Sequence, residues 1–252
     1  MASTLLSSRR GVATATVVGR GRLGRPVARA LEAAGMRVNG PTGRGEFIMP
    51  ADVVLLCVPD AEIAELAASL NLPGMQVGHM SGATSIAGVD FGIHPLQTFV
   101  GDEGPEVFRG IGCAVEGRSP EALSVAQELA RLLGARPFVI SDHQRAGYHA
   151  AASLASNLVL SVLAAAEEMA ATAGLAPEDA RSLLAPLAQS TVVNWAERGP
   201  RAALTGPIVR GDIATVQRQR DAVEGGAPEL LPLFDALCAS TRTLATTEPV
   251  TT

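Results

Sequence analysis

The chain has 252 residues, enough for one large domain or two modest ones with substantial apolar cores. Hydrophobic residues make up 47% and charged residues 18%, a balance that excludes a disordered chain. The net charge of −5 and the scattered arginines argue against nucleic acid as a partner. The three cysteines lack the short spacings of metal clips or disulfide frameworks, so we expect no metal and a reducing, cytoplasmic compartment.

Two apolar stretches raise the question of a membrane. The first follows the N-terminal arginines and leads directly into a glycine-rich turn without a cleavage site, so we expect an N-terminal extension instead of a signal peptide. The second, residues 150–166, is Ala-rich, interrupted by serines and Asn157, and short for a bilayer. We expect it to be a buried bundle helix and expect no membrane partner.

From Thr14 to about Asp142, short β-branched runs alternate with helical stretches, the pattern of βαβ units. The predicted strands are Thr14–Val18, Met36–Asn39, Val53–Val58, Gln76–His79, Phe91–His94, Gly112–Val115 and Pro137–Ile140. The predicted helices between them include Arg25–Ala34, Ala61–Ala68 and Pro120–Leu133. This pattern predicts an α/β fold with a Rossmann-type parallel sheet in a domain at 12–142. The β-branched runs then stop, and glycine- and proline-broken helices predict an all-helical domain at 143–252.

A glycine-rich turn follows the first predicted strand and precedes an amphipathic helix. Gly19, Gly21 and Gly24 form a GxGxxG fingerprint in this context, which disfavours the alternative of three ordinary turn glycines. The glycines would permit the tight turn, the approach of a pyrophosphate and close helix–strand packing. The predicted dinucleotide-binding residues of this turn are Gly19, Arg20, Gly21, Arg22, Leu23 and Gly24.

The segment after the second predicted strand bears on the choice between NADP and NAD. NAD sites usually place an acid here, whereas this chain has Asn39-Gly-Pro-Thr-Gly-Arg44 and no acid before Glu46. Thr42 and Arg44 could therefore hold a 2′-phosphate, and NADP is favoured over NAD. The alternative is a solvated loop arginine.

Polar clusters follow three successive predicted strands, where ligands bind in open parallel sheets. Val58-Pro59 belongs to the predicted cofactor site, and Ser81 and His94 follow the next two strands. Of the four histidines, His79, His94 and His149 fall where a cleft is expected, and imidazole suits acid chemistry at neutral pH. We favour His94 and His149. The alternatives are structural histidines and an ordinary turn at Ser81.

A polar stripe marks the long helix after the boundary, where His149, Ser153 and Asn157 recur every four residues on one face. The stripe either lines a substrate cleft, which we favour, or bonds to neighbouring helices. Further along, Thr205 and Arg210 lie in a glycine-proline turn, and Arg210 could bind a substrate carboxylate. The alternative there is a helix cap with a surface Arg210–Asp212 pair.

The segments VVGRGRLG, LLCVPDAEI, HMSGA, GIHPLQTF, GYHAAASLASN and ALTGPIVRGD resemble a family of oxidoreductases that joins a Rossmann-like domain to a C-terminal domain of unknown function (domain of unknown function 2520). The resemblance spans roughly residues 14–245. It extends to the wider group of 6-phosphogluconate dehydrogenase, pyrroline-5-carboxylate reductase, prephenate dehydrogenase and ketopantoate reductase. It implies NADP(H) at the glycine turn and Val58-Pro59, and a homodimer formed through the helical domain.

The resemblance also implies substrate near Ser81, His94, His149 and Asn157, and makes a small 2-keto acid such as ketopantoate a candidate. Two features depart from the pattern: the long helix lacks the lysine of many relatives, and Gln219 replaces an expected histidine. We therefore expect an NADP(H)-dependent oxidoreductase that transfers a hydride to or from a small carbonyl or imine compound. The alternatives are a prephenate-like or hydroxy-acid dehydrogenase and a non-catalytic NADP(H) sensor or scaffold.

Overall fold

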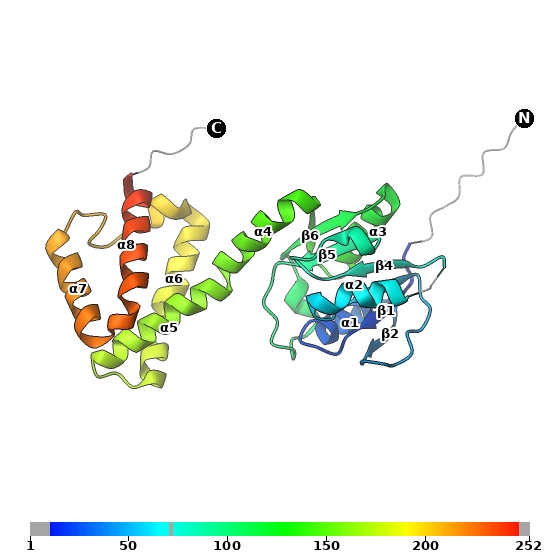
Figure 1. Cartoon of the computed structure of the whole chain (residues 1–252), viewed down its shortest axis with the longest axis horizontal. Coiled ribbons are helices and arrows are strands. Elements are labelled where there is room, and N and C mark those ends of the chain that lie inside the picture. The colour runs from blue at the N-terminus through cyan, green and yellow to red at the C-terminus, as the bar shows by residue number, and fades with distance from the viewer. Residues whose placement is uncertain (1–10, 71–72, 247–252) are drawn as a thin grey trace, which may run out of the picture. The chain divides into compact units, whose positions relative to one another are not determined.

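A computed structural model describes residues 11–70 and 73–246 (Figure 1). Most of the predicted N-terminal extension, residues 1–10, lies outside the described residues. The chain forms two compact units that divide between Ser156 and Asn157. The predicted boundary near residue 142 falls where the strands end, and helix α4 (Asp142–Ala155) lies between the two positions.

The first unit contains a seven-stranded sheet with the order β2-β1-β3-β4-β5-β6-β7, which confirms the predicted Rossmann-type α/β fold. The strands are β1 (Thr14–Val18), β2 (Arg37–Thr42), β3 (Val53–Leu56), β4 (Gln76–His79), β5 (Phe91–Pro95), β6 (Gly112–Gly117) and β7 (Arg136–Val139). All seven predicted strands are present. The largest difference is at β2, which continues to Thr42, a residue that lines a pocket at the carboxyl ends of the strands.

The direction of the last two strands differs from the prediction. Strands β1 to β5 are parallel, but β6 pairs with β5 antiparallel, with Phe91 opposite Gly117 and Pro95 opposite Cys113. The predicted parallel sheet is therefore confirmed for β1 to β5, whereas β6 and β7 are parallel to each other and antiparallel to those five strands. Between β5 and β6 the chain forms only the short 3₁₀ helix η2 (Pro105–Phe108), whereas a parallel connection needs a crossover, usually an α-helix.

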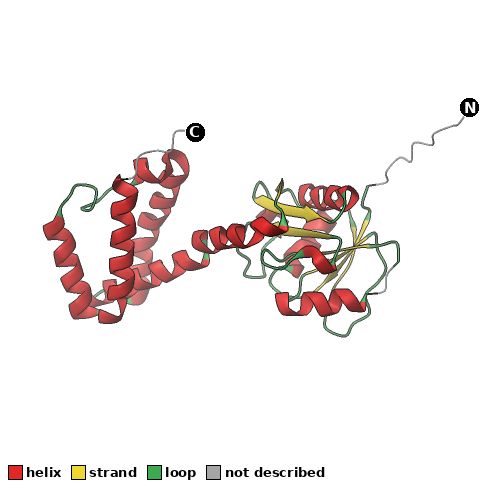
Figure 2. Ribbon diagram, turned by 45° about the horizontal axis from the view of Figure 1, so that its top comes forward, coloured by secondary structure: helices red, strands yellow, loops and turns green. Residues whose placement is uncertain are grey.

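Helices cover both faces of the sheet (Figure 2). Helices α1 (Gly24–Ala33) and α3 (Pro120–Leu132) pack on one face, and α2 (Asp60–Ser69) packs on the other. Because alternate strand residues point to opposite faces, Val17 and Leu55 join the α1 and α3 core while Val18 and Leu56 join the α2 core. The carboxyl ends of β1 and β3, which are paired in the sheet, are therefore packed between an apolar layer on each face.

Helix α4 is held on the α2 side of the sheet by a buried ion-pair network. Arg145 is only 4% exposed and pairs with Glu116 of β6 and, at 3.0 Å, with Asp142. Asp142 in turn accepts a hydrogen bond from Ser85. Charges removed from water are tolerated when each is paired, so these contacts define one position of α4 on the sheet. They place Tyr148, one turn further along, against the end of β5.

The second unit is all-helical, as predicted. It comprises α5 (Asn157–Thr172), α6 (Pro177–Ala203), α7 (Ile213–Gly226), the 3₁₀ helix η3 (Pro228–Leu230) and α8 (Leu231–Thr246). Two bidentate ion pairs link neighbouring helices of this unit. Arg181 of α6 binds Glu167 of α5, and Arg220 of α7 binds Asp235 of α8.

The second unit leaves an unusual amount of apolar surface uncovered. The expectation of a buried bundle helix at 150–166 is wrong for the single chain, because α5 has no buried residue and Leu160 is 66% exposed. On α6, Leu187 and Trp195 are likewise exposed. Patches of this kind mark an interaction surface. The span Asp142–Thr172 is long and apolar enough to cross a membrane by length and composition, although its first half carries the Arg145 ion pairs to the sheet.

Candidate functional site

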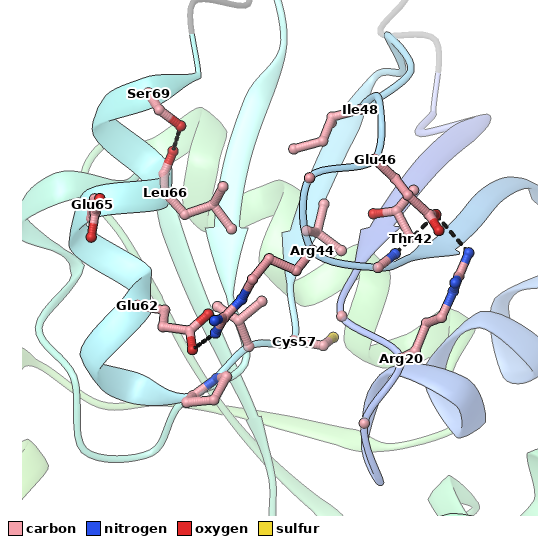
Figure 3. A pocket seen from close by; sticks show the side chains of 17 residues that line it. Arg20, Thr42, Arg44, Glu46, Ile48, Cys57, Glu62, Glu65, Leu66 and Ser69 are labelled. Carbon is pink, nitrogen blue, oxygen red and sulfur yellow. Dashed lines mark hydrogen bonds and ion pairs between the residues drawn. The ribbon is translucent and has the colours of Figure 1, made fainter.

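A pocket of about 1000 Å³ opens at the carboxyl ends of β1, β2 and β3 (Figure 3). Strand β1 lies between β2 and β3, so the chain turns to opposite sides of β1 and leaves a crevice there, the position at which doubly wound sheets bind ligands. Seven of the predicted cofactor residues line it: Gly19, Arg20, Gly21, Thr42, Arg44, Val58 and Pro59. Arg22, Leu23 and Gly24 lie in the same turn but are not part of the lining.

The three glycines of the fingerprint have different physical roles. Gly19 has a φ of +112°, and a Cβ there would lie 2.2 Å from the carbonyl oxygen of Cys57. A Cβ on Gly24 would lie 1.9 Å from the carbonyl oxygen of Gly19. A Cβ on Gly21 would meet no atom within 4 Å. Gly19 and Gly24 are therefore required by packing, whereas Gly21 leaves an open approach to the backbone.

The N-terminus of α1 is free to receive an anion. Its first turn has no acidic residue, and no side chain caps it. The first backbone N–H groups of a helix have no partner within the helix and carry partial positive charge. Together with the open approach at Gly21, this geometry fits the diphosphate of a dinucleotide.

Two ion pairs occupy the pocket at the end of β2 (Figure 3). Arg20 donates to Glu46 at 2.6 Å, and Glu46 also accepts the N–H of Gly43 at 3.0 Å. Arg44 reaches from the same loop to Glu62 of α2. The Gly43 N–H, followed by the Arg20 guanidinium, holds the pKa of the Glu46 carboxyl below its usual value.

Glu46 was not predicted as a site residue. Its separation from the end of β2 suggested that no acid reaches the ribose position, but the turn that joins Gly43 to Glu46 brings the carboxylate back to the strand end. The only signal in the sequence was the short Gly43–Glu46 spacing.

His79 and Ser81 have structural roles in the loop after β4. His79 is fully buried; its Nδ1 accepts the Ser81 N–H at 3.2 Å and its Nε2 lies 3.3 Å from the Ser85 carbonyl oxygen. The Ser81 hydroxyl accepts the N–H groups of Ala83 and Thr84 and donates to the Thr84 hydroxyl. These bonds form a serine turn, and the role of Ser81 in the reaction stays a prediction.

His94 lies at the end of β5 and forms the second cluster of the first unit. Its Nδ1 is 2.5 Å from the Tyr148 hydroxyl, and the ring centroids of His94 and His149 are 6.2 Å apart. Gly82 packs against the His94 ring, since a Cβ there would lie 2.7 Å from Cε1. The structure thus brings His94 and His149 together as expected. Tyr148, the only tyrosine of the chain, was missed because nothing in the sequence links it to a strand end 54 residues earlier.

The protonation states of this cluster follow from burial. Desolvation, followed by the nearby His149 and Arg145, lowers the pKa of His94 to about 4. Burial raises the pKa of Tyr148, so the phenol stays protonated and has a hydrogen available to donate to His94 Nδ1. When the phenol is the donor, neutral His94 carries its proton on Nε2. The chain contains no lysine, so histidine is the available nitrogen acid.

The other predicted substrate residues are distributed over both units. Ser153 lies on α4, and Asn157 begins α5 after a break at Ser156, so the assumed continuous face of one helix is interrupted. Thr205 and Arg210 are exposed in the loop between α6 and α7, where Asp212 caps α7. Their roles stay predictions. Within residues 11–70 and 73–246, no group of three or more histidine, cysteine or acidic side chains could hold a metal ion.

The lowered pKa of His94 predicts a pH dependence of stability. Unfolded His94 binds a proton near pH 6.5, whereas folded His94 does so only near pH 4, so the free energy of unfolding falls as the pH drops through this window. The loss should be about 3 kcal/mol, since one pKa unit corresponds to about 1.4 kcal/mol. Urea unfolding at a series of pH values should show a flatter profile for His94→Gln than for the wild type. His143→Gln, which changes an exposed histidine of α4, is the control. Equal slopes in all three proteins would contradict the assignment.

Comparisons with known proteins agree with this architecture. Crystal structures of a candidate NADP oxidoreductase from Bacteroides fragilis and of a protein from Thermotoga maritima each match with a TM-score of 0.75, at 22% and 25% identity, covering 92% of this chain and 98% of theirs. A pyrroline carboxylate reductase from Plasmodium falciparum with NADP bound matches with a TM-score of 0.58 at 11% identity, covering 93% of this chain and 98% of that one. A comparison with curated proteins gives no match. Residues 111–241, more than half of the chain, match the family described as Domain of unknown function (DUF2520), and the chain belongs to this family.

Proposed function

We propose that the protein is an NADP(H)-dependent oxidoreductase that transfers a hydride to or from a small carbonyl or imine compound. The observation that carries this proposal is the glycine turn at the switch point of the sheet. There Gly19 and Gly24 are fixed by packing, Gly21 is open, and the uncapped N-terminus of α1 borders a pocket of about 1000 Å³. The fold shared with a reductase that holds NADP supports the same reading.

In this proposal the diphosphate lies along the glycine turn, with Val58 and Pro59 beside it, and Arg20 and Arg44 are the cations available to a 2′-phosphate. The nicotinamide ring supplies or accepts the hydride when the cofactor is bound. NADP is the proposed cofactor in preference to NAD because two arginines line the end of β2.

The histidine cluster provides the proton chemistry of the proposed reaction. His94 is neutral near pH 7, and its Nε2–H, fixed by the Tyr148 hydrogen bond on Nδ1, is a hydrogen-bond donor for a carbonyl oxygen or imine nitrogen. The ring of His149 lies against the ring of His94 and is likewise only partly buried, so we assign proton delivery to His149. The proposed substrate class is a small 2-keto acid such as ketopantoate, or a cyclic imine.

Replacement of His149 by alanine should lower turnover by about 100-fold, the usual contribution of one positioned acid. NADPH affinity should change by less than about twofold, a negligible free-energy difference, since His149 does not line the cofactor pocket. NADPH oxidation over a panel of 2-keto acids and cyclic imines gives kcat, and fluorescence titration gives the dissociation constant.

His143→Ala is the matched control for this experiment, because His143 is an exposed histidine of the same helix that bonds only to Ser141 among the described contacts. It should retain full turnover. Equal loss of turnover and affinity in His149→Ala, or no loss, would remove His149 from the mechanism. NADPH binding without oxidation of any panel compound would favour a sensor or scaffold.

The exposed apolar side chains of the second unit indicate what kind of partner the protein binds. We propose that a second copy of the chain covers Leu160 of α5 together with Leu187 and Trp195 of α6. A membrane fits this surface less well, because α6 interleaves its apolar residues with charged ones, including Arg181 and Glu197. An interface between identical chains is the commonest way for soluble proteins to cover such a patch.

The wild-type protein should therefore sediment as a dimer without detergent, and the double substitution Leu160→Glu with Leu187→Glu should shift it to monomer. The physical reason is the cost of burying two unpaired carboxylates per chain in an apolar contact. Sedimentation velocity measures the change, and Leu237→Glu on α8 is a control with the same chemistry at another exposed leucine. A monomeric wild type, or one that partitions into lipid vesicles, would contradict the proposal.

A further inference from the structure

At the end of β2, the Arg20 guanidinium and the Gly43 N–H form an anion-binding site, and the Glu46 carboxylate of the same chain occupies it. One oxygen of Glu46, Oε2, accepts hydrogen bonds both from Arg20 at 2.6 Å and from the Gly43 N–H at 3.0 Å (Figure 3). The guanidinium is itself held in place, since its Nε donates to the Pro41 carbonyl oxygen at 2.9 Å. A guanidinium and a backbone N–H converging on one oxygen form the arrangement that binds carboxylates and phosphates.

The local chain is shaped for this contact. A Cβ at position 43 would lie 3.2 Å both from the Arg20 guanidinium and from the Glu46 carboxylate, closer than most side-chain contacts allow. Glycine at this position therefore lets both charged groups approach the strand end. The second arginine of the pocket, Arg44, is directed away to Glu62 on α2, so Arg20 is the cation at this anion site.

The site lies where the adenosine ribose of a dinucleotide binds in this fold, beyond the end of the second strand. Resting on the proposed function, we propose that Glu46 is a tethered competitor for the 2′-phosphate of NADP: the phosphate displaces the Glu46 carboxylate from Arg20 and the Gly43 N–H, and Glu46 thereby sets the preference between NADP and NAD.

The charges make the two occupants mutually exclusive. A phosphate monoester carries about −1.5 to −2 charge at pH 7 and three acceptor oxygens, and it cannot share Arg20 and the Gly43 N–H with a carboxylate without strong repulsion. NAD has a hydroxyl at this position and leaves Glu46 in place. The protein therefore loses the Glu46 contacts when it binds NADP and keeps them when it binds NAD.

The substitution Glu46→Gln removes the competing charge while keeping an amide oxygen that can still accept the Gly43 N–H. Calorimetric titration should then show adenosine 2′,5′-bisphosphate and NADPH binding about tenfold more tightly than to the wild type, a typical effect of one charge-assisted hydrogen bond at a partly solvated site. Binding of 5′-AMP and NADH should change by less than about twofold, a negligible free-energy difference.

The control is Glu103→Gln, which removes the same charge from a carboxylate that also accepts backbone N–H groups but lies outside the pocket. It should leave all four affinities unchanged. In an Arg20→Met background, adenosine 2′,5′-bisphosphate should bind more weakly, and Glu46→Gln should add no further gain, because the residue for which the two anions compete is absent.

Equal tightening of phosphorylated and unphosphorylated ligands by Glu46→Gln would overturn the proposal, because it would indicate a general charge effect. Weaker NADH binding without tighter NADPH binding would also overturn it, since Glu46 would then be a ribose ligand. If neither the wild type nor Glu46→Gln binds any of the four ligands, the proposed function itself fails. Circular dichroism of each variant establishes that the fold is retained.

Discussion

The close approach of the backbone at the β1–α1 turn is the constraint on which the rest of the candidate site depends. The carbonyl oxygen of Gly19 lies where a Cβ on Gly24 would be, and the carbonyl oxygen of Cys57 lies where one on Gly19 would be. This contact joins the ends of β1 and β3 to the start of α1. It therefore determines where the pocket opens and which N–H groups face it, and it requires glycine for steric reasons alone.

Arginines at two places in the first unit, the pocket and the contact of α4 with the sheet, are paired with carboxylates of the same chain. In the pocket, Glu46 pairs with Arg20 and Glu62 pairs with Arg44, so an anionic ligand that used either arginine would have to replace a carboxylate. Beneath α4, Arg145 is paired with carboxylates and contributes to keeping His94 neutral. Ion pairs with carboxylates of the protein thus hold these cations in place in the absence of a ligand.

Much of the first unit could be predicted from the sequence because its signals are local. The strands and the glycine turn follow from β-branched runs, helical periods and the spacing of Gly19, Gly21 and Gly24. The direction of β6 could not be predicted, because it depends on whether the preceding loop contains a crossover helix. The contact of Tyr148 with His94 and the return of Glu46 to the end of β2 could not be predicted either, because both depend on tertiary packing. The exposure of α5 in the single chain could not be predicted, because an apolar helix reads the same whether its own chain or a partner covers it.

A titration with NADPH shows whether the glycine turn binds a dinucleotide diphosphate. We expect saturable binding to the wild type and its loss in Gly21→Val, where the new side chain enters open space needed by the ligand without a clash in the protein. Gly88→Val, at another glycine with open surroundings but outside the pocket, should bind like the wild type. Absence of saturable binding to the folded wild type, or undiminished binding to Gly21→Val, would contradict the account.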